Sequence, residues 1–146
     1  MMMMLRRTFA LLVLVGSPGI AGCGNGLAKV SGAVTLDGIP IQGGPQMYAT
    51  VNFVREDGRG TSSIGIIDAS GHYTLRMGAQ EGIQPGSYLV GIAAQKVTPP
   101  ATPEGMPQAT LVTPPKYADI THSGFREDVK AGHNTFDFAL SLAGKK

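Results

Sequence analysis

The stretch His133-Asn134-Thr135-Phe136-Asp137-Phe138-Ala139-Leu140-Ser141-Leu142-Ala143 alternates apolar and polar side chains at every second position. Successive side chains of an extended chain point to opposite faces, so this period predicts a strand with one buried face. The buried face is expected to hold Phe136, Phe138, Leu140 and Leu142. This segment therefore indicates a core built from β-sheet.

The same alternation recurs at Val30–Asp37 and at His72–Met77. Tyr88–Ala94 is apolar on both faces, which predicts a strand at the centre of a sheet. The remaining expected strands are a long stretch without glycine or proline, residues 46–57, and shorter runs that contain apolar residues. The seven expected strands cover residues 30–37, 46–57, 64–67, 72–77, 88–94, 125–130 and 133–143.

Turns separate these segments throughout the chain, which has 21 glycines and 10 prolines among its 146 residues. Long helices have little room between such breakers. Pairs such as Asp37-Gly38, Asp57-Gly58 and Ser70-Gly71 have the chemistry of tight turns. About seven short strands with frequent turns predict an all-β fold, a single antiparallel seven-stranded β-sandwich.

The segment Gln95–Pro115 departs from the strand pattern because it contains six of the ten prolines. Such a density favours extended polyproline conformation and argues against pairing within a central strand. A connection of this length is commonly either functional or disordered. Two interpretations stay open, a draped spacer and a contact surface, and the candidate contact residues are Pro99, Pro100, Pro103, Pro107 and Pro114.

The N-terminal residues have the order of an export signal: cationic Arg6-Arg7, the apolar run Phe9–Val15, and small residues before Cys23. Seven apolar residues are too few to cross a membrane, which takes about 20. Ile20-Ala21-Gly22-Cys23 resembles a bacterial lipobox, which implies cleavage before Cys23 and its lipidation. The expected organisation is a signal peptide at 1–22, a lipidated tether at 23–28 and a domain at 29–146.

Two alternatives for this segment stay open, an ordinary secretory signal and a twin-arginine signal that starts at Arg6-Arg7. The general secretory route is preferred because Leu5 replaces the expected Ser or Thr. Gly24 after the cysteine is compatible with export to an outer membrane. The expected location is the cell envelope, with the chain held on the membrane by lipid and the outer membrane favoured over the inner.

Composition limits the function. Removing Arg6 and Arg7 leaves 12 − 2 = 10 basic against 10 acidic residues, so no basic patch indicates nucleic-acid binding. Cys23 is the only cysteine, so no disulfide is expected. Trp is absent and aromatics make up 6%, which argues against a stacking platform for sugars or bases.

Catalytic and metal motifs are missing from the sequence. The three histidines, His72, His122 and His133, lack the spacing of a zinc motif and are expected on the surface. Asp68-Ala69-Ser70-Gly71 is interpreted as a hairpin turn. Lys29 and Asn134 supply the residue types for an internal isopeptide bond, although both fall at strand ends where water opposes the reaction. No catalytic residue, metal or cofactor is therefore expected.

A family resemblance spans almost the whole expected domain. The carrying segments are Val30-Ser31-Gly32-Ala33-Val34-Thr35-Leu36-Asp37-Gly38-Ile39-Pro40-Ile41, Val51-Asn52-Phe53, Asp68-Ala69-Ser70-Gly71-His72-Tyr73-Thr74-Leu75, Ile83–Val90, Pro115–Asp119, Ser123–Phe125 and Asn134–Leu140. In this order they resemble the carboxypeptidase regulatory-like, transthyretin-like (prealbumin-like) β-sandwich domains of secreted bacterial lipoproteins. The resemblance implies a non-catalytic scaffold. Glu127 departs from the pattern, as either a protective charge on an edge strand or a buried carboxylate.

Three functions follow as expectations. The first is a non-enzymatic, lipid-anchored interaction module that presents sandwich-end loops and the proline-rich segment to an envelope protein or carbohydrate. The second is a passive structural component of the envelope matrix. The third is a transthyretin-like hydrolase, which is the weakest because fold does not imply function.

Overall fold

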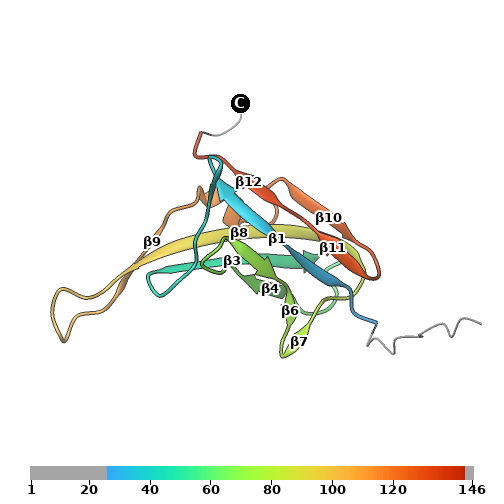
Figure 1. Ribbon diagram of the computed structural model, residues 1–146, viewed down its shortest axis with the longest axis horizontal. Helices are drawn as coiled ribbons and strands as arrows, with labels where there is room; N and C mark the ends of the chain where they lie inside the picture. The colour runs from blue at the N-terminus through green and yellow to red at the C-terminus, as the bar shows by residue number, and fades with distance from the viewer. Residues whose placement is uncertain (1–25, 144–146) are drawn as a thin grey trace, which may run out of the picture.

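Two β-sheets packed face to face form the part of the chain that the computed structural model describes, residues 26–143 (Figure 1). Strands dominate both layers, and the helix among these residues is the single turn α1 (Pro115–Ala118). The predicted all-β sandwich is confirmed.

The first sheet is organised around β1 (Lys29–Leu36). On one side β1 pairs in antiparallel fashion with β2 (Ile39–Pro40) and β5 (His72–Thr74). On the other side it pairs in parallel with β11 (His133–Thr135) and β12 (Phe138–Leu140). The first and last expected strands are thus neighbours, and this parallel pair is an exception in a sandwich whose other pairings are antiparallel.

The second sheet is larger, and its longest strand is β8 (Gly86–Thr98), whose neighbours lie on both sides. One neighbour is β3 (Met47–Arg55), which pairs with β8 over nine residue pairs. The strand order is β10 (Phe125–Val129), β8, β3, β4 (Ser63–Ile66), β6 (Arg76–Met77) and β7 (Gln80–Glu81), with β9 (Gln108–Leu111) also paired to β8.

The core lies between the sheets and follows the predicted alternation. Phe53 on β3 is at its centre, fully buried, with ring centroids 5.9 Å from Tyr88 and 6.2 Å from both Phe136 and Phe138. Tilted and edge-on aromatic pairs at such distances add to the burial of apolar surface. The sandwich is held by this aromatic cluster, since no disulfide is available.

The last strand differs from its prediction. It is interrupted at residues 136–137, and Leu142 is 61% exposed instead of buried. The strand is interrupted because the backbones of Gly32 on β1 and Phe136 are in contact: a Cβ on Gly32 would lie 1.8 Å from the carbonyl oxygen of Phe136. At the break, the Asp137 carboxylate accepts a hydrogen bond of 2.8 Å from the Ala33 backbone N–H, which replaces the missing strand partner.

Each of the seven predicted strands has a counterpart in the structure, and β2, β7 and β9 are additional. The prediction for Gln95–Pro115 was wrong in part. Residues 95–98 continue β8, and Gln108–Leu111 pairs with them as β9, so the segment is a β-hairpin. The prolines 99, 100, 103 and 107 lie in the connection between the two strands, where no ladder hydrogen bond is required of them.

Glu127 lies on β10, which is an edge strand as predicted, and its half-buried side chain lies on the same face as Phe125 and Val129. Burial, and secondarily the Asp128 carboxylate, raises the pKa of Glu127. A raised pKa in the folded state means that ionised Glu127 opposes folding above its ordinary pKa of 4.5.

We therefore expect Glu127→Gln to raise the free energy of unfolding at pH 7, by less than about 1 kcal/mol because water still reaches the group. The gain should vanish below the unfolded pKa, where both states are protonated. Urea unfolding between pH 3.5 and pH 7 measures this, with exposed Glu104→Gln as the control. A gain that persists at pH 3.5 would show that charge is not the cause.

Candidate functional site

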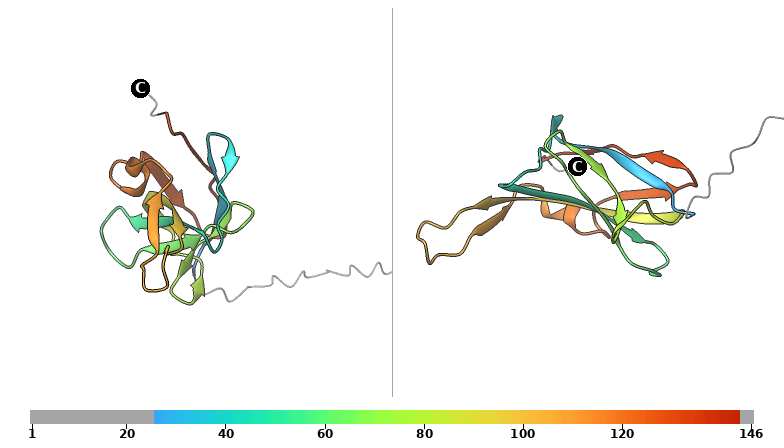
Figure 2. Two further views of the ribbon diagram at one scale, coloured as in Figure 1. Left: turned by 90° about the vertical axis from the view of Figure 1, so that its left-hand side faces the viewer. Right: turned by 60° about the horizontal axis from the view of Figure 1, so that its bottom comes forward.

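The β8–β9 hairpin, residues 95–111, projects beyond the sandwich as an arm (Figure 1). Its side chains are exposed apart from Val97 and Leu111, which are half-buried. The views in Figure 2 agree that the arm extends away from the two layers. A two-stranded ribbon with no layer packed on it gains little from burial, so an arm of this kind is suited to contact another molecule.

The arm is anchored because β8 is shared with the core. Ile92 and Ala94 of β8 are fully buried, and residues 95–98 of the same strand form one of the two strands of the arm. The Val97 backbone N–H donates to the Gln46 carbonyl at 2.8 Å, which extends the β3 side to the base of the arm. The arm is therefore a continuation of the central strand.

The tip of the arm brings together four of the five proline candidates, Pro99, Pro100, Pro103 and Pro107, all exposed. Met106 beside them is 84% exposed. A shallow hollow of about 170 Å³ is lined by Pro99, Pro100, Met106, Thr98, Ala101 and Gln108. The tip thus presents an apolar surface of rigid proline rings with a small depression.

Pro114 belongs to a different environment. It is half-buried at the base of the arm and precedes α1, where its carbonyl accepts the Tyr117 N–H at 3.1 Å. Its neighbour Thr113 is 2% exposed, and its Oγ1 accepts the Ala94 N–H at 3.2 Å. Pro114 is therefore a structural residue at the N-cap of α1, and only the other four candidate prolines are exposed at the tip.

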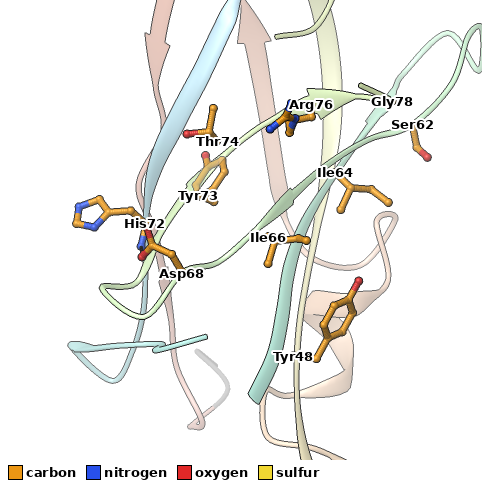
Figure 3. Close-up of a pocket in the computed structure, with 10 residues that line it drawn as sticks. All are labelled: Tyr48, Ser62, Ile64, Ile66, Asp68, His72, Tyr73, Thr74, Arg76 and Gly78. Carbon is orange, nitrogen blue, oxygen red and sulfur yellow. Dashed lines mark hydrogen bonds between the residues drawn. The ribbon is translucent and has the colours of Figure 1, made fainter. Parts of the chain in front are cut away.

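A second concave surface, with a volume of about 590 Å³, is lined by β3, β4 and β6 of the second sheet and by β5 of the first. Ile64 and Ile66 of β4 are 46% and 62% exposed, and Tyr48 of β3 is 55% exposed. Figure 3 shows these three side chains on one side of the groove, and on the other the segment that carries His72 and Thr74 of β5 and Arg76 of β6. The groove thus has an apolar floor and a polar wall.

The polar wall of the groove is held by local hydrogen bonds. Asp68 accepts from the Ser70 hydroxyl at 2.6 Å, from the Ser70 N–H at 2.8 Å and from the His72 N–H at 3.1 Å. The Ser70 bond, followed by the His72 N–H, lowers the pKa of Asp68. These bonds form the hairpin turn that was predicted at Asp68-Ala69-Ser70-Gly71.

Tyr73, beside this wall, is buried. Burial, reinforced by the carboxylates of Asp137 and Glu127, raises the pKa of Tyr73.

A third hollow, at the sandwich end near the β1–β2 turn, is about 420 Å³ and mainly apolar. Ile39 is 70% exposed and Leu142 is 61% exposed at its rim. Loops at the end of the sandwich were expected to form contact surfaces, and at this end two large apolar side chains are exposed together.

The histidines are exposed, as predicted. His122 Nδ1 lies 2.7 Å from Asp119, and the Thr121 hydroxyl bond followed by the His122 bond lowers the pKa of Asp119. Within residues 26–143, no group of three or more His, Cys, Asp or Glu side chains could hold a metal. Over the same range, no helix is long and apolar enough to span a bilayer. Cys23, the expected lipidation site, and the expected signal peptide at residues 1–22 lie outside the described residues.

The Lys29–Asn134 pair does not form the arrangement that an isopeptide requires. The Lys29 amine lies 3.6 Å from Glu81 and its side chain is 56% exposed. The Asn134 amide donates to the Lys130 carbonyl at 2.7 Å and its oxygen accepts the Lys130 N–H at 3.0 Å. Asn134 therefore closes the turn before β11.

Sequence reasoning missed the groove residues Tyr48, Ile64 and Ile66. The signal was present, because Ile64 and Ile66 stand two apart on a short strand and so share a face with each other and not with Ile67. Which of these two faces is buried depends on the position of the first sheet, which the spacing does not reveal.

The fold and its surfaces define a β-sandwich domain with a projecting hairpin arm. No protein-family model matches this chain, and no curated protein matches it. Among solved structures, the chain is similar to the dioxygenase domain of a dioxygenase carbohydrate-binding protein fusion from Streptomyces sp. SirexAA-E. The identity is 19%, the match covers 92% of this chain and 97% of that chain, and the TM-score is 0.34. A similarity at this level carries no conclusion about activity.

Proposed function

We propose that this chain is a non-enzymatic, lipid-anchored interaction module of the cell envelope, related to the carboxypeptidase regulatory-like domains. The observation that supports it is the arm, a continuation of the central strand whose tip side chains are all exposed. Cys23 supplies the anchor in this proposal, exported by the general secretory route.

The geometry favours a protein partner over a carbohydrate. The tip offers proline rings and Met106, which is 84% exposed. The arm has two charged residues, Lys96 in β8 and Glu104 in the tip. Methionine is adaptable at contact surfaces, and proline loses little conformational entropy when it is bound. Sugar binding usually relies on aromatic platforms, and among the described residues Tyr48 is the exposed large aromatic side chain.

The structure defines a clean test. Thr98 and Gln108 are directly opposite each other in the hairpin, so residues 99–107 can be replaced by Asn-Gly, which closes a two-residue hairpin turn. We expect this tip replacement to remove partner capture, measured by crosslinking in intact cells followed by mass spectrometry. The unfolding midpoint should stay unchanged because Thr113 and the residues of β9 remain.

A matched variant separates the tip from the outer groove. Ile66→Ser places a hydroxyl on the apolar floor of the groove and leaves the tip intact, so partner capture should persist. Capture that survives the tip replacement contradicts the assignment of the tip. A smear of envelope proteins in place of one stoichiometric partner favours the passive matrix component instead.

The anchor has its own test. Intact mass of the membrane-extracted protein should correspond to a chain that begins at Cys23 and carries acyl groups. Recovery of a chain that retains residues 1–22 would contradict the anchor while leaving the arm unaffected.

A further inference from the structure

The free edge of β9 has an unusual character for an exposed sheet edge. Among the described strands, β8 is the one that pairs with β9, so the other side of β9 has no strand neighbour. Edge strands are commonly protected from pairing by charges, prolines or bulges. The residues of β9, Gln108-Ala109-Thr110-Leu111, include no charge and no proline.

The edge strand β10, which also pairs with β8, differs from β9 in its charged residues. The edge strand β10 carries Arg126, Glu127 and Asp128 in succession, with Arg126 paired to Glu56. Charged residues on an edge discourage a further strand from adding there. The same sheet therefore protects one edge strand and leaves the other open to pairing.

The register shows which groups of β9 face outward. The Val112 N–H donates to the Ala94 carbonyl at 2.8 Å, so the opposed residues 94 and 112 form a hydrogen-bonded pair with β8. Pairs alternate along an antiparallel ladder. The N–H and C=O groups of Ala109 and Leu111 consequently point away from β8, toward the open side.

We propose that two copies of this chain associate through antiparallel pairing of their β9 strands, with Thr110 opposite Thr110 on a two-fold axis. In this register Ala109 of each copy faces Leu111 of the other, and all the outward groups of both residues are used. The alternative centred on Ala109 would place Leu111 opposite Pro107, which has no N–H to donate. Facing threonines are a favourable cross-strand pair.

The expected association is weak in dilute solution, because four residues of strand bury far less than the roughly 1,200 Å² of a stable interface. Confinement on a bilayer, which rests on the anchor of the proposed function, raises the effective concentration of the two copies. The test therefore uses the full chain in intact cells. Self-pairing and capture of a partner by the tip have separate readouts, so failure of one is distinguishable from failure of the other.

Thr110→Cys tests the pairing directly. Facing residues of a non-hydrogen-bonded antiparallel pair have Cα atoms about 4.5 Å apart, which suits a disulfide. Oxidation with copper–phenanthroline should convert most of this variant to a covalent dimer on a non-reducing gel. Gln108→Cys is the matched control, since its two copies would lie about 13 Å apart along the strands, and the unaltered chain controls for Cys23.

One further variant makes the result specific. Ala109→Pro removes an outward N–H that β8 does not use, so it should reduce the Thr110→Cys dimer to the level of the unaltered chain without changing the unfolding midpoint. Absence of the Thr110→Cys dimer, an equal dimer from Gln108→Cys, or a dimer that persists with Ala109→Pro would overturn the proposal; a β9 occupied by a different protein would give the first of these.

Discussion

Gly43→Ala should destabilise the protein by about 3 kcal/mol or more, the upper range for overpacking a close contact. A Cβ at this position would lie 1.8 Å from the carbonyl oxygen of Ile67 and 2.8 Å from its carbonyl carbon. Neither group can move easily, because Ile67 is 1% exposed and its N–H donates to Ala49 at 2.9 Å. Urea unfolding followed by far-ultraviolet circular dichroism measures the loss.

The neighbouring residue gives a control of opposite sign. A Cβ on Gly44 meets nothing within 4 Å, and its φ is outside the left-handed region. Gly44→Ala should therefore be neutral or stabilise by up to about 1 kcal/mol, because alanine restricts the unfolded chain. Equal effects of the two substitutions would contradict the close approach of Gly43 to Ile67.

Phe53→Ala should cost about 3–5 kcal/mol, the usual range for truncating a buried aromatic residue. Phe53 is fully buried and is the ring shared by both layers, in contact with Tyr88 of the second sheet and Phe138 of the first. Its removal leaves a cavity between the sheets that the neighbouring rings can fill only in part. The unfolding free energy is again the measurement, supported by loss of near-ultraviolet signal from the tyrosines.

The control for Phe53→Ala lies on the same strand. Tyr48 points to the outer face and is 55% exposed, so Tyr48→Ala should change the unfolding free energy by less than about 1 kcal/mol. A similar loss in both variants would mean that the core is not centred on Phe53.

Alternation within the sequence was enough to predict strands β1, β5 with β6, and β11 with β12, because a period of two depends only on the local chain. Strand β8 was predicted from a run that is apolar on both faces. The break at Phe136-Asp137 was not predictable in this way. It results from contact with Gly32, and Asp137 binds the Ala33 N–H across 104 positions of sequence. Close approach of distant backbones leaves no mark on local spacing, apart from the glycine itself.

The arm shows a different limit. Six prolines dominated the interpretation of Gln95–Pro115, yet the run between Pro107 and Pro114 has no proline and is long enough for a short strand. The effect of each proline depends on its position: four lie at the tip, and Pro114 is the N-cap of α1. Their number left a draped spacer and a contact surface both open, and only the register with β8 distinguishes the four exposed prolines of the tip from Pro114.

Because β8 runs without interruption from the buried layer to the tip, a pull on the tip acts along the axis of that strand. Its nine paired positions with β3 would then be loaded in shear, all together, instead of opening one after another. The described chain begins at the end of the molecule opposite the arm (Figure 1). A tensile load between these two ends would therefore make β8 and β3 slide past each other, which requires many hydrogen bonds to break at once.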